Sequence, residues 1–180
     1  MDWKGCLLPL ALPLSVLVIG SWRSAVSDRA PSPPPELFQK SQDPAPDYTQ
    51  APPGTHPTCQ DDPALADLLL AEGRRLGIVA KTGLPELPGK DASYRAEPGR
   101  LGTITIKQRP MSPLVRCQLV SHEFIHVLQH LHGNLRGVPP LGWTNEHPDP
   151  IPQEAEAYGY QQRAGYVLSL LQATSRTSTN

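Results

Sequence analysis

The sequence predicts a small α+β domain in which a short antiparallel sheet packs with helices. Three stretches support this class. Residues 61–76 have the pattern of an amphipathic helix, two strand-like stretches flank the turn Glu97-Pro98-Gly99, and a strongly apolar helix follows Ser112. Because the 22 prolines of the 180-residue chain are concentrated before residue 59, the part able to fold is one small domain of about 120 residues.

Residues 1–27 are predicted to be an export signal. A lysine precedes an apolar run that ends at Gly20, and Ala25-Val26-Ser27 offers small residues for cleavage. The alternative is an uncleaved N-terminal anchor, although Pro9 and Pro13 disfavour a membrane-spanning helix. We therefore expect an exported protein, periplasmic or extracellular, that contacts a membrane only through this segment if it stays uncleaved.

Residues 28–58 are predicted to be a disordered, proline-rich linker. Nine prolines and few large apolar side chains leave this segment unable to bury enough surface to offset the entropy lost on ordering. Residues 59–173 form the predicted domain, and residues 174–180 a disordered polar tail. The net charge is −1 and no basic block alternates with aromatic residues, so no nucleic-acid partner is expected.

The first predicted helix begins at Asp61-Asp62-Pro63 and ends at Gly77. The acidic residues suit an N-cap, and the proline suits the first turn. The residues after the helix, 81–89, are expected to form a loop. The core face of the helix is expected to consist of Leu65, Leu68, Leu69, Ala71 and Leu76.

Two short strands are expected between residues 92 and 107, on either side of the Glu97-Pro98-Gly99 turn. In the second strand Ile104 and Ile106 face one side, and polar residues alternate with them on the other side. This alternation predicts a half-buried antiparallel strand.

The next predicted helix begins at Ser112-Pro113, ends before Gly133 and is apolar on nearly every side, as buried helices are. It contains His122-Glu123-Phe124-Ile125-His126, a match to the His-Glu-x-x-His pattern. Residues four apart on a helix project about 40° apart, so the two histidines can direct their imidazoles at one ion. Glu123 projects beside such an ion, which suits a base that takes a proton from a metal-bound water.

A catalytic zinc ion needs a third protein ligand, and the last predicted helix, residues 153–172, offers Glu154 and Glu156. These two residues project about 200° apart, so only one of them can face the metal. Glu154 is preferred because it shares its face with small and apolar residues, which suits close approach to the motif helix. Glu156, on a more polar face, is the alternative third ligand.

Two histidines on the motif helix are weaker candidates for the third ligand. His132 has the spacing of the metzincin pattern, but Gln129 stands in place of the metzincin glycine and no methionine follows residue 111. His130 shares a face with His126 but lies one turn too far along the helix. Both are expected to be solvated or to lie behind the ligands.

The motif helix followed by Glu154-x-x-Ala157 resembles the gluzincin metallopeptidases, the thermolysin-like class and its minimal relatives. The resemblance covers residues 59–173 and implies a zincin-like fold with the buried motif helix packed on a C-terminal ligand helix. It implies one Zn²⁺, with Glu123 as catalytic base and a peptide or protein substrate. It further implies that the strand Leu101–Lys107 is an edge strand that binds an extended peptide. The implied zinc ligands are His122, His126 and Glu154.

Tyr158 stands where these peptidases commonly place a polar residue that orients a ligand histidine. Its hydroxyl could fill that role. Alternatively, a donor to the oxyanion of the reaction could come from Tyr158, Tyr160, Tyr166 or His147.

Cys59 and Cys117 remain after removal of the signal segment. In an oxidising compartment an even pair predicts one disulfide, which would join the start of the domain to the motif helix. Two separate buried thiols are the alternative.

The sequence therefore predicts a zinc-dependent peptidase that hydrolyses peptide bonds through a zinc-activated water. The alternative is a non-catalytic, tethered module of the cell envelope whose zinc site is structural or vestigial. A structural zinc would be closed by four protein ligands, whereas a catalytic zinc keeps one position open.

Overall fold

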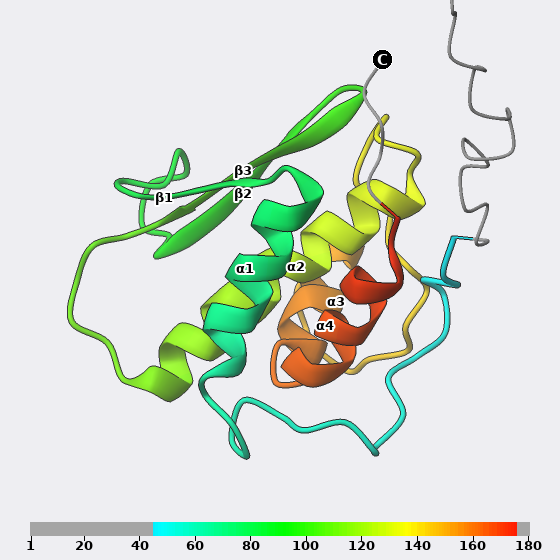
Figure 1. Cartoon of the computed structure of the whole chain (residues 1–180), viewed down its shortest axis with the longest axis horizontal. Coiled ribbons are helices and arrows are strands. Elements are labelled where there is room, and N and C mark those ends of the chain that lie inside the picture. Colours follow the sequence, from blue (N-terminus) through cyan, green and yellow to red (C-terminus); the bar gives the residue numbers. More distant parts are fainter. Residues whose placement is uncertain (1–44, 176–180) are drawn as a thin grey trace, which may run out of the picture. The chain divides into compact units, whose positions relative to one another are not determined.

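The computed structural model describes residues 45–175, which form four helices and three strands (Figure 1). This confirms the α+β class. The predicted signal segment, residues 28–44 of the predicted linker and residues 176–180 lie outside the described residues. In the part of the chain that is described, no helix has the length and apolarity needed to span a membrane. In chain order the elements are α1 (Leu65–Leu76), β1 (Val79–Thr82), β2 (Ala92–Glu97), β3 (Arg100–Ile106), α2 (Pro113–His132), α3 (Pro152–Tyr160) and α4 (Ala164–Ala173).

The sheet is mixed rather than wholly antiparallel. β3 is the central strand, antiparallel to β2 and parallel to β1, in the order β1-β3-β2. The expected hairpin is present and turns at Gly99, whose φ of 78° suits glycine. The expectation that Leu101–Lys107 is an edge strand is wrong, because β1 covers its other side. The last two residues of β1, Lys81 and Thr82, fall in the stretch 81–89 predicted as a loop. The four residues of β1 are mostly exposed and show no apolar alternation that could have predicted a strand.

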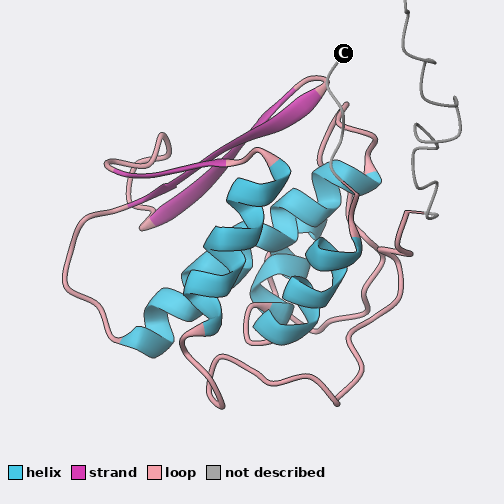
Figure 2. Cartoon of the chain, in the orientation of Figure 1, coloured by secondary structure: helices cyan, strands magenta, loops and turns pink. Residues whose placement is uncertain are grey.

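Helix α2 is the central helix of the domain, and α1 lies beside it and also contacts the sheet at β1 (Figure 2). Helix α2 contacts β2 and β3 on one side and α1, α3 and α4 on others, which explains why its sequence is apolar on nearly every side. Its predicted start is confirmed, since the Ser112 hydroxyl accepts the N–H of Val115 at 3.2 Å and Pro113 occupies the first turn. Its predicted end at Gly133 is confirmed as well.

Helix α1 begins at Leu65, later than the predicted Asp61, and ends at Gly77 as expected. Its buried face agrees with the expected one at Leu65, Leu69 and Leu76, but Leu68 is 50% exposed and Ala71 is exposed. Gly73 also belongs to the buried face, since a β-carbon there would lie 2.6 Å from the ring of Phe124. α2 therefore approaches α1 closely at this glycine. The buried residues of α1 are Leu65, Ala66, Leu69, Leu70, Gly73 and Leu76.

The expected single helix over residues 153–172 is two helices, α3 and α4, separated by a turn at residues 161–163. The main chain around this turn binds residues that precede α1. The N–H of Cys59 donates to the carbonyl of Gln162 at 2.9 Å, and the N–H of Gly165 donates to the carbonyl of Pro57 at 3.1 Å. A β-carbon on Gly165 would lie 2.5 Å from that carbonyl, so glycine is needed for this contact.

Residues 45–58, here called the N-terminal strap, pack on the domain although their composition predicts a disordered linker. Trp143 donates its indole N–H to the carbonyl of Tyr48 at 3.0 Å, and the Tyr166 hydroxyl donates to the carbonyl of Gln50 at 2.7 Å. The buried Tyr48 hydroxyl lies 2.9 Å from Oγ1 of Thr174, a residue predicted to start the disordered tail. The folded domain therefore extends beyond the predicted 59–173.

Cys59 and Cys117 are both fully buried and form a disulfide, with their Cα atoms 5.6 Å apart. The bond joins the segment before α1 to the second turn of α2. It fixes the N-terminal half of α2 relative to the strap, five residues before the first motif histidine.

Candidate metal centre

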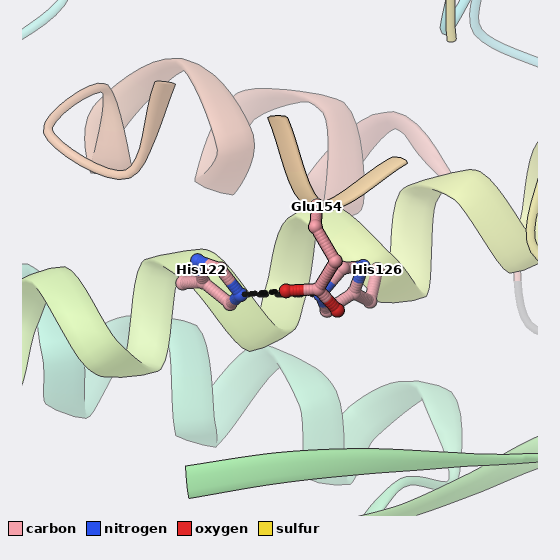
Figure 3. Close-up of side chains that lie close together, drawn as sticks. All are labelled: His122, His126 and Glu154. Carbon is pink, nitrogen blue, oxygen red and sulfur yellow. Dashed lines mark hydrogen bonds and ion pairs between the residues drawn. The ribbon is translucent and has the colours of Figure 1, made fainter. Parts of the chain in front are cut away.

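Three side chains converge between α2 and α3: His122 and His126 from α2, and Glu154 from α3 (Figure 3). The two Nε2 atoms lie 3.2 Å apart, and the nearest Glu154 oxygens lie 3.5 Å from His122 Nε2 and 3.4 Å from His126 Nε2. Two donors bound to one tetrahedral ion at about 2.0–2.1 Å are about 3.3 Å apart. The separation of the two histidine nitrogens fits that geometry, and each has a different oxygen of Glu154 at a similar distance. With one donor atom from each residue, the three atoms lie within 4.8 Å of one another, so this group could hold a metal ion.

The electrostatics of the group also fit a cation. His122 is 6% and His126 8% exposed, and two Nε2 atoms at 3.2 Å cannot both carry a proton. The two imidazoles hold the pKa of Glu154 far below its usual range. Burial lowers the pKa of His122, which favours the neutral form that binds metal. Among the described residues, buried Oε2 of Glu154 has no hydrogen-bond partner, as expected for an oxygen facing an ion.

Glu123 lies on the wall of the same cavity as the three ligand candidates and is 4% exposed. Burial raises the pKa of Glu123 to about 7, with smaller opposing effects from the charge on His126 and the backbone N–H of Tyr94. A carboxyl group with such a pKa can both accept and release a proton near neutral pH.

Gln129 orients His126. Its side-chain Oε1 lies 2.8 Å from His126 Nδ1, and because an amide oxygen only accepts, His126 must donate from Nδ1. This leaves the Nε2 lone pair of His126 directed at the metal group. The sequence interpretation considered Gln129 only as a departure from the metzincin pattern. Its position three residues after His126 on the same helix was the signal that could have identified it.

Glu156, the alternative third ligand, does not face the group. It is 3% exposed, and its carboxylate accepts four N–H groups of the protein. Gln129 Nε2 donates at 2.9 Å, and the backbone N–H groups of Leu141, Gly142 and Trp143 donate at 2.8, 2.6 and 2.9 Å. Glu156 thus anchors the loop before α3, and it fixes the side chain of Gln129 by accepting a hydrogen bond from its Nε2. The structure favours Glu154 over Glu156 as the ligand.

Tyr158 packs its ring on His122, with ring centroids 4.4 Å apart, and stacks with the exposed ring of His147 at 4.8 Å. Its hydroxyl binds no ligand histidine. Instead it accepts a hydrogen bond from Lys90 Nζ at 2.9 Å, and Lys90 lies 3.9 Å from Oε2 of Glu154. The sequence interpretation did not single out Lys90, because a lone lysine in a predicted loop carries no pattern.

The other aromatic and histidine candidates lie away from His122, His126 and Glu154. The Tyr160 hydroxyl donates to the carbonyl of Thr144, and the Tyr166 hydroxyl to the strap. His130 is buried with its Nδ1 2.8 Å from the Tyr94 hydroxyl, so it joins α2 to β2. His132 is exposed, as expected.

The metal group opens on a cavity of about 240 Å³, which is bordered by the edge strand β2 and by residues 87–91. Ala92, Ser93 and Tyr94 of β2 line it, so the edge strand beside the site is β2 and not the predicted residues 101–107. Comparisons of the chain with protein-family models, curated proteins and solved structures gave no match. The chemistry of the site is therefore inferred from its own geometry.

Proposed function

We propose that the chain is a zinc-dependent peptidase with a gluzincin-like site, in which His122, His126 and Glu154 hold one Zn²⁺ and Glu123 is the general base. One observation carries the proposal. The Nε2 atoms of His122 and His126 lie 3.2 Å apart, each with an oxygen of Glu154 within 3.5 Å, beside a buried carboxyl group on the wall of one cavity.

The donor set supports zinc. Two imidazole nitrogens and one carboxylate oxygen suit Zn²⁺, and three protein ligands leave one position for water. Calcium and magnesium bind mostly oxygen ligands. When bound, zinc would polarise the substrate carbonyl and lower the pKa of its water toward 7.

Glu123 would hold and move the proton. In peptide hydrolysis it takes a proton from the attacking water and later passes it to the leaving amine. The pKa of about 7 that burial gives Glu123 suits both transfers. Gln129 supports the reaction indirectly, since it keeps the Nδ1 proton of His126 turned away from the site.

Substrate binding would use β2. One side of β2 pairs with β3, and its residues Ala92 to Tyr94 also line the cavity. An exposed strand edge can pair with an extended peptide through backbone hydrogen bonds. An extended peptide on this edge would bring its backbone past Glu123.

The disulfide supports action outside the cytoplasm, because such bonds form and persist in oxidising compartments. Export by residues 1–27 stays a prediction, since that segment lies outside the described residues. A structural zinc in a non-catalytic module is the competing function. It would need four protein ligands, whereas the described residues bring three together at an open cavity.

Glu123→Gln in the full chain tests the proposal. This variant should keep one zinc per chain and lose hydrolysis of a mixed peptide library, read by mass spectrometry, by about 10²–10⁴-fold. His126→Ala is the matched control and should lose zinc. Unchanged hydrolysis by Glu123→Gln, or zinc binding by a wild type that cleaves nothing, would refute the peptidase.

A further inference from the structure

Lys90 is the only lysine or arginine among the described residues that line the cavity. Its ammonium group donates to the Tyr158 hydroxyl at 2.9 Å and lies 5.3 Å from the centre of the Tyr158 ring. An ammonium group has three N–H donors, and in the described part of the chain Tyr158 is its one hydrogen-bond acceptor. Two donors of Lys90 are thus available to a ligand.

Among the described residues, no carboxylate accepts a hydrogen bond from Lys90, although the charges of Glu154 and Asp149 both act on it. The neighbouring Asp91 binds Arg109, with Nε to Oδ1 at 2.9 Å, and lies 3.7 Å from Lys107 Nζ. Glu154 is the carboxylate at ion-pair distance from Lys90, at 3.9 Å, which is beyond hydrogen-bonding distance. Because Glu154 also faces both imidazoles, it would share its charge with an ion bound there.

A site loaded with a divalent cation would therefore attract anions. Asp91 also lines the cavity, but Arg109 offsets its charge. The cation and Lys90 then outweigh the negative charges of Glu154 and Glu123, even when Glu123 is ionised. A lysine that served only to neutralise Glu154 would repel the cation that Glu154 binds. A ligand with a negatively charged oxygen relieves this repulsion, since it can contact both positive groups.

We propose that Lys90, together with the hydroxyl of Tyr158, binds a negatively charged oxygen in the cavity beside His122, His126 and Glu154. In the reaction proposed above, on which this inference rests, that oxygen is the carbonyl oxygen of the scissile peptide bond. Water adds to the carbonyl carbon, Glu123 takes one water proton, and the carbonyl electron pair moves to the oxygen that Lys90 contacts. The pair then reforms the carbonyl as the C–N bond breaks, and Glu123 passes its proton to the amine.

The proposal can be tested without a known substrate by titrating inorganic phosphate into the zinc-loaded full chain in a calorimeter. Lys90→Met should weaken phosphate binding by about 10-fold or more, because it removes a charged donor. Lys81→Met is the matched control, since Lys81 is an exposed lysine of β1 that does not line the cavity. It makes the same change in net charge and should leave phosphate binding unchanged.

Zinc affinity, measured by competition with a chromophoric chelator, separates anion binding from support of the metal site. It should be equal or higher in Lys90→Met than in wild type, because a repulsive charge is removed. Equal phosphate affinity in Lys90→Met and wild type, an equal loss in Lys81→Met, or a loss of zinc affinity in Lys90→Met would overturn the proposal.

Different outcomes would refute the role of Lys90 and the peptidase activity. Phosphate binding that depends on Lys90 would stand even if the zinc-loaded chain cleaved no peptide, and only the peptidase would then be refuted. Cleavage that survives Lys90→Met with an unchanged kcat would refute the role of Lys90 and leave the peptidase intact. A chain that binds no zinc would overturn both.

Discussion

Glu154 and Glu156 lie two residues apart on α3, and the structure gives them opposite roles that a pair of alanine variants can separate. Glu156→Ala removes the acceptor of four N–H groups inside the protein. Hydrogen bonds to a charged group contribute about 1.5–3 kcal/mol each, but the loop can relax and water can enter. We therefore expect a loss of about 3–5 kcal/mol, the range for breaking a buried ionic interaction. This is a large share of the about 5–15 kcal/mol that stabilise a small domain.

Glu154→Ala should behave in the opposite way. Glu154 accepts no hydrogen bond from a backbone N–H among the described residues, and its side chain is 25% exposed. Its loss removes the contacts with His122 and His126, so it should lower the free energy of unfolding of the metal-free protein, but by less than Glu156→Ala does, because it leaves no buried backbone N–H without an acceptor. It should lower zinc affinity by about 10²-fold or more, because one of three ligands is lost.

Both variants can be measured in the same two assays. Urea unfolding of metal-free protein, followed by tryptophan fluorescence, gives stability without the contribution of bound metal. Trp143 is a suitable reporter, since its backbone N–H binds Glu156 and its side chain is 2% exposed. Chelator competition gives zinc affinity. Loss of zinc affinity in Glu156→Ala at unchanged stability, or full zinc affinity in Glu154→Ala, would refute the assignment.

Two further changes test the support of the site. Gln129→Leu should lower zinc affinity by about 10–100-fold, because His126 loses the acceptor that fixes its Nδ1 proton; an unchanged affinity in chelator competition would contradict this role. Replacing Cys59 and Cys117 by alanine should lower the free energy of unfolding by about 4 kcal/mol, since the bond closes a loop with a sequence separation of 58. Equal urea midpoints of oxidised and reduced wild type would count against that value.

The features that sequence predicts well are those set by local spacing. The four-residue interval of the motif histidines and the Ser112-Pro113 start both depend on helix geometry alone, and α2 has both features. Helix geometry also predicts that only one of Glu154 and Glu156 can face α2, and the small and apolar residues on the face of Glu154 favour that residue. Their different partners agree with this preference.

The features that sequence could not predict depend on contacts between distant residues. Lys90 and Tyr158 are 68 residues apart, and nothing in either neighbourhood indicates that they meet. The break between α3 and α4 lies where the main chain forms hydrogen bonds with Pro57 and Cys59, and within the helix itself only Gly165 indicates this contact. β1 is a strand because β3 pairs with it, although its own residues show no strand pattern.

The contact between Tyr48 and Thr174 spans 126 positions of the chain and brings the two ends of the described domain together at one place. A short flexible linker could therefore join these ends, while new termini are opened at the exposed residues 108–110 between β3 and α2. In such a circular permutant the first element would be the helix that carries His122 and His126. The ligand helix would follow it directly, so the whole metal group would come from the first half of the rearranged chain.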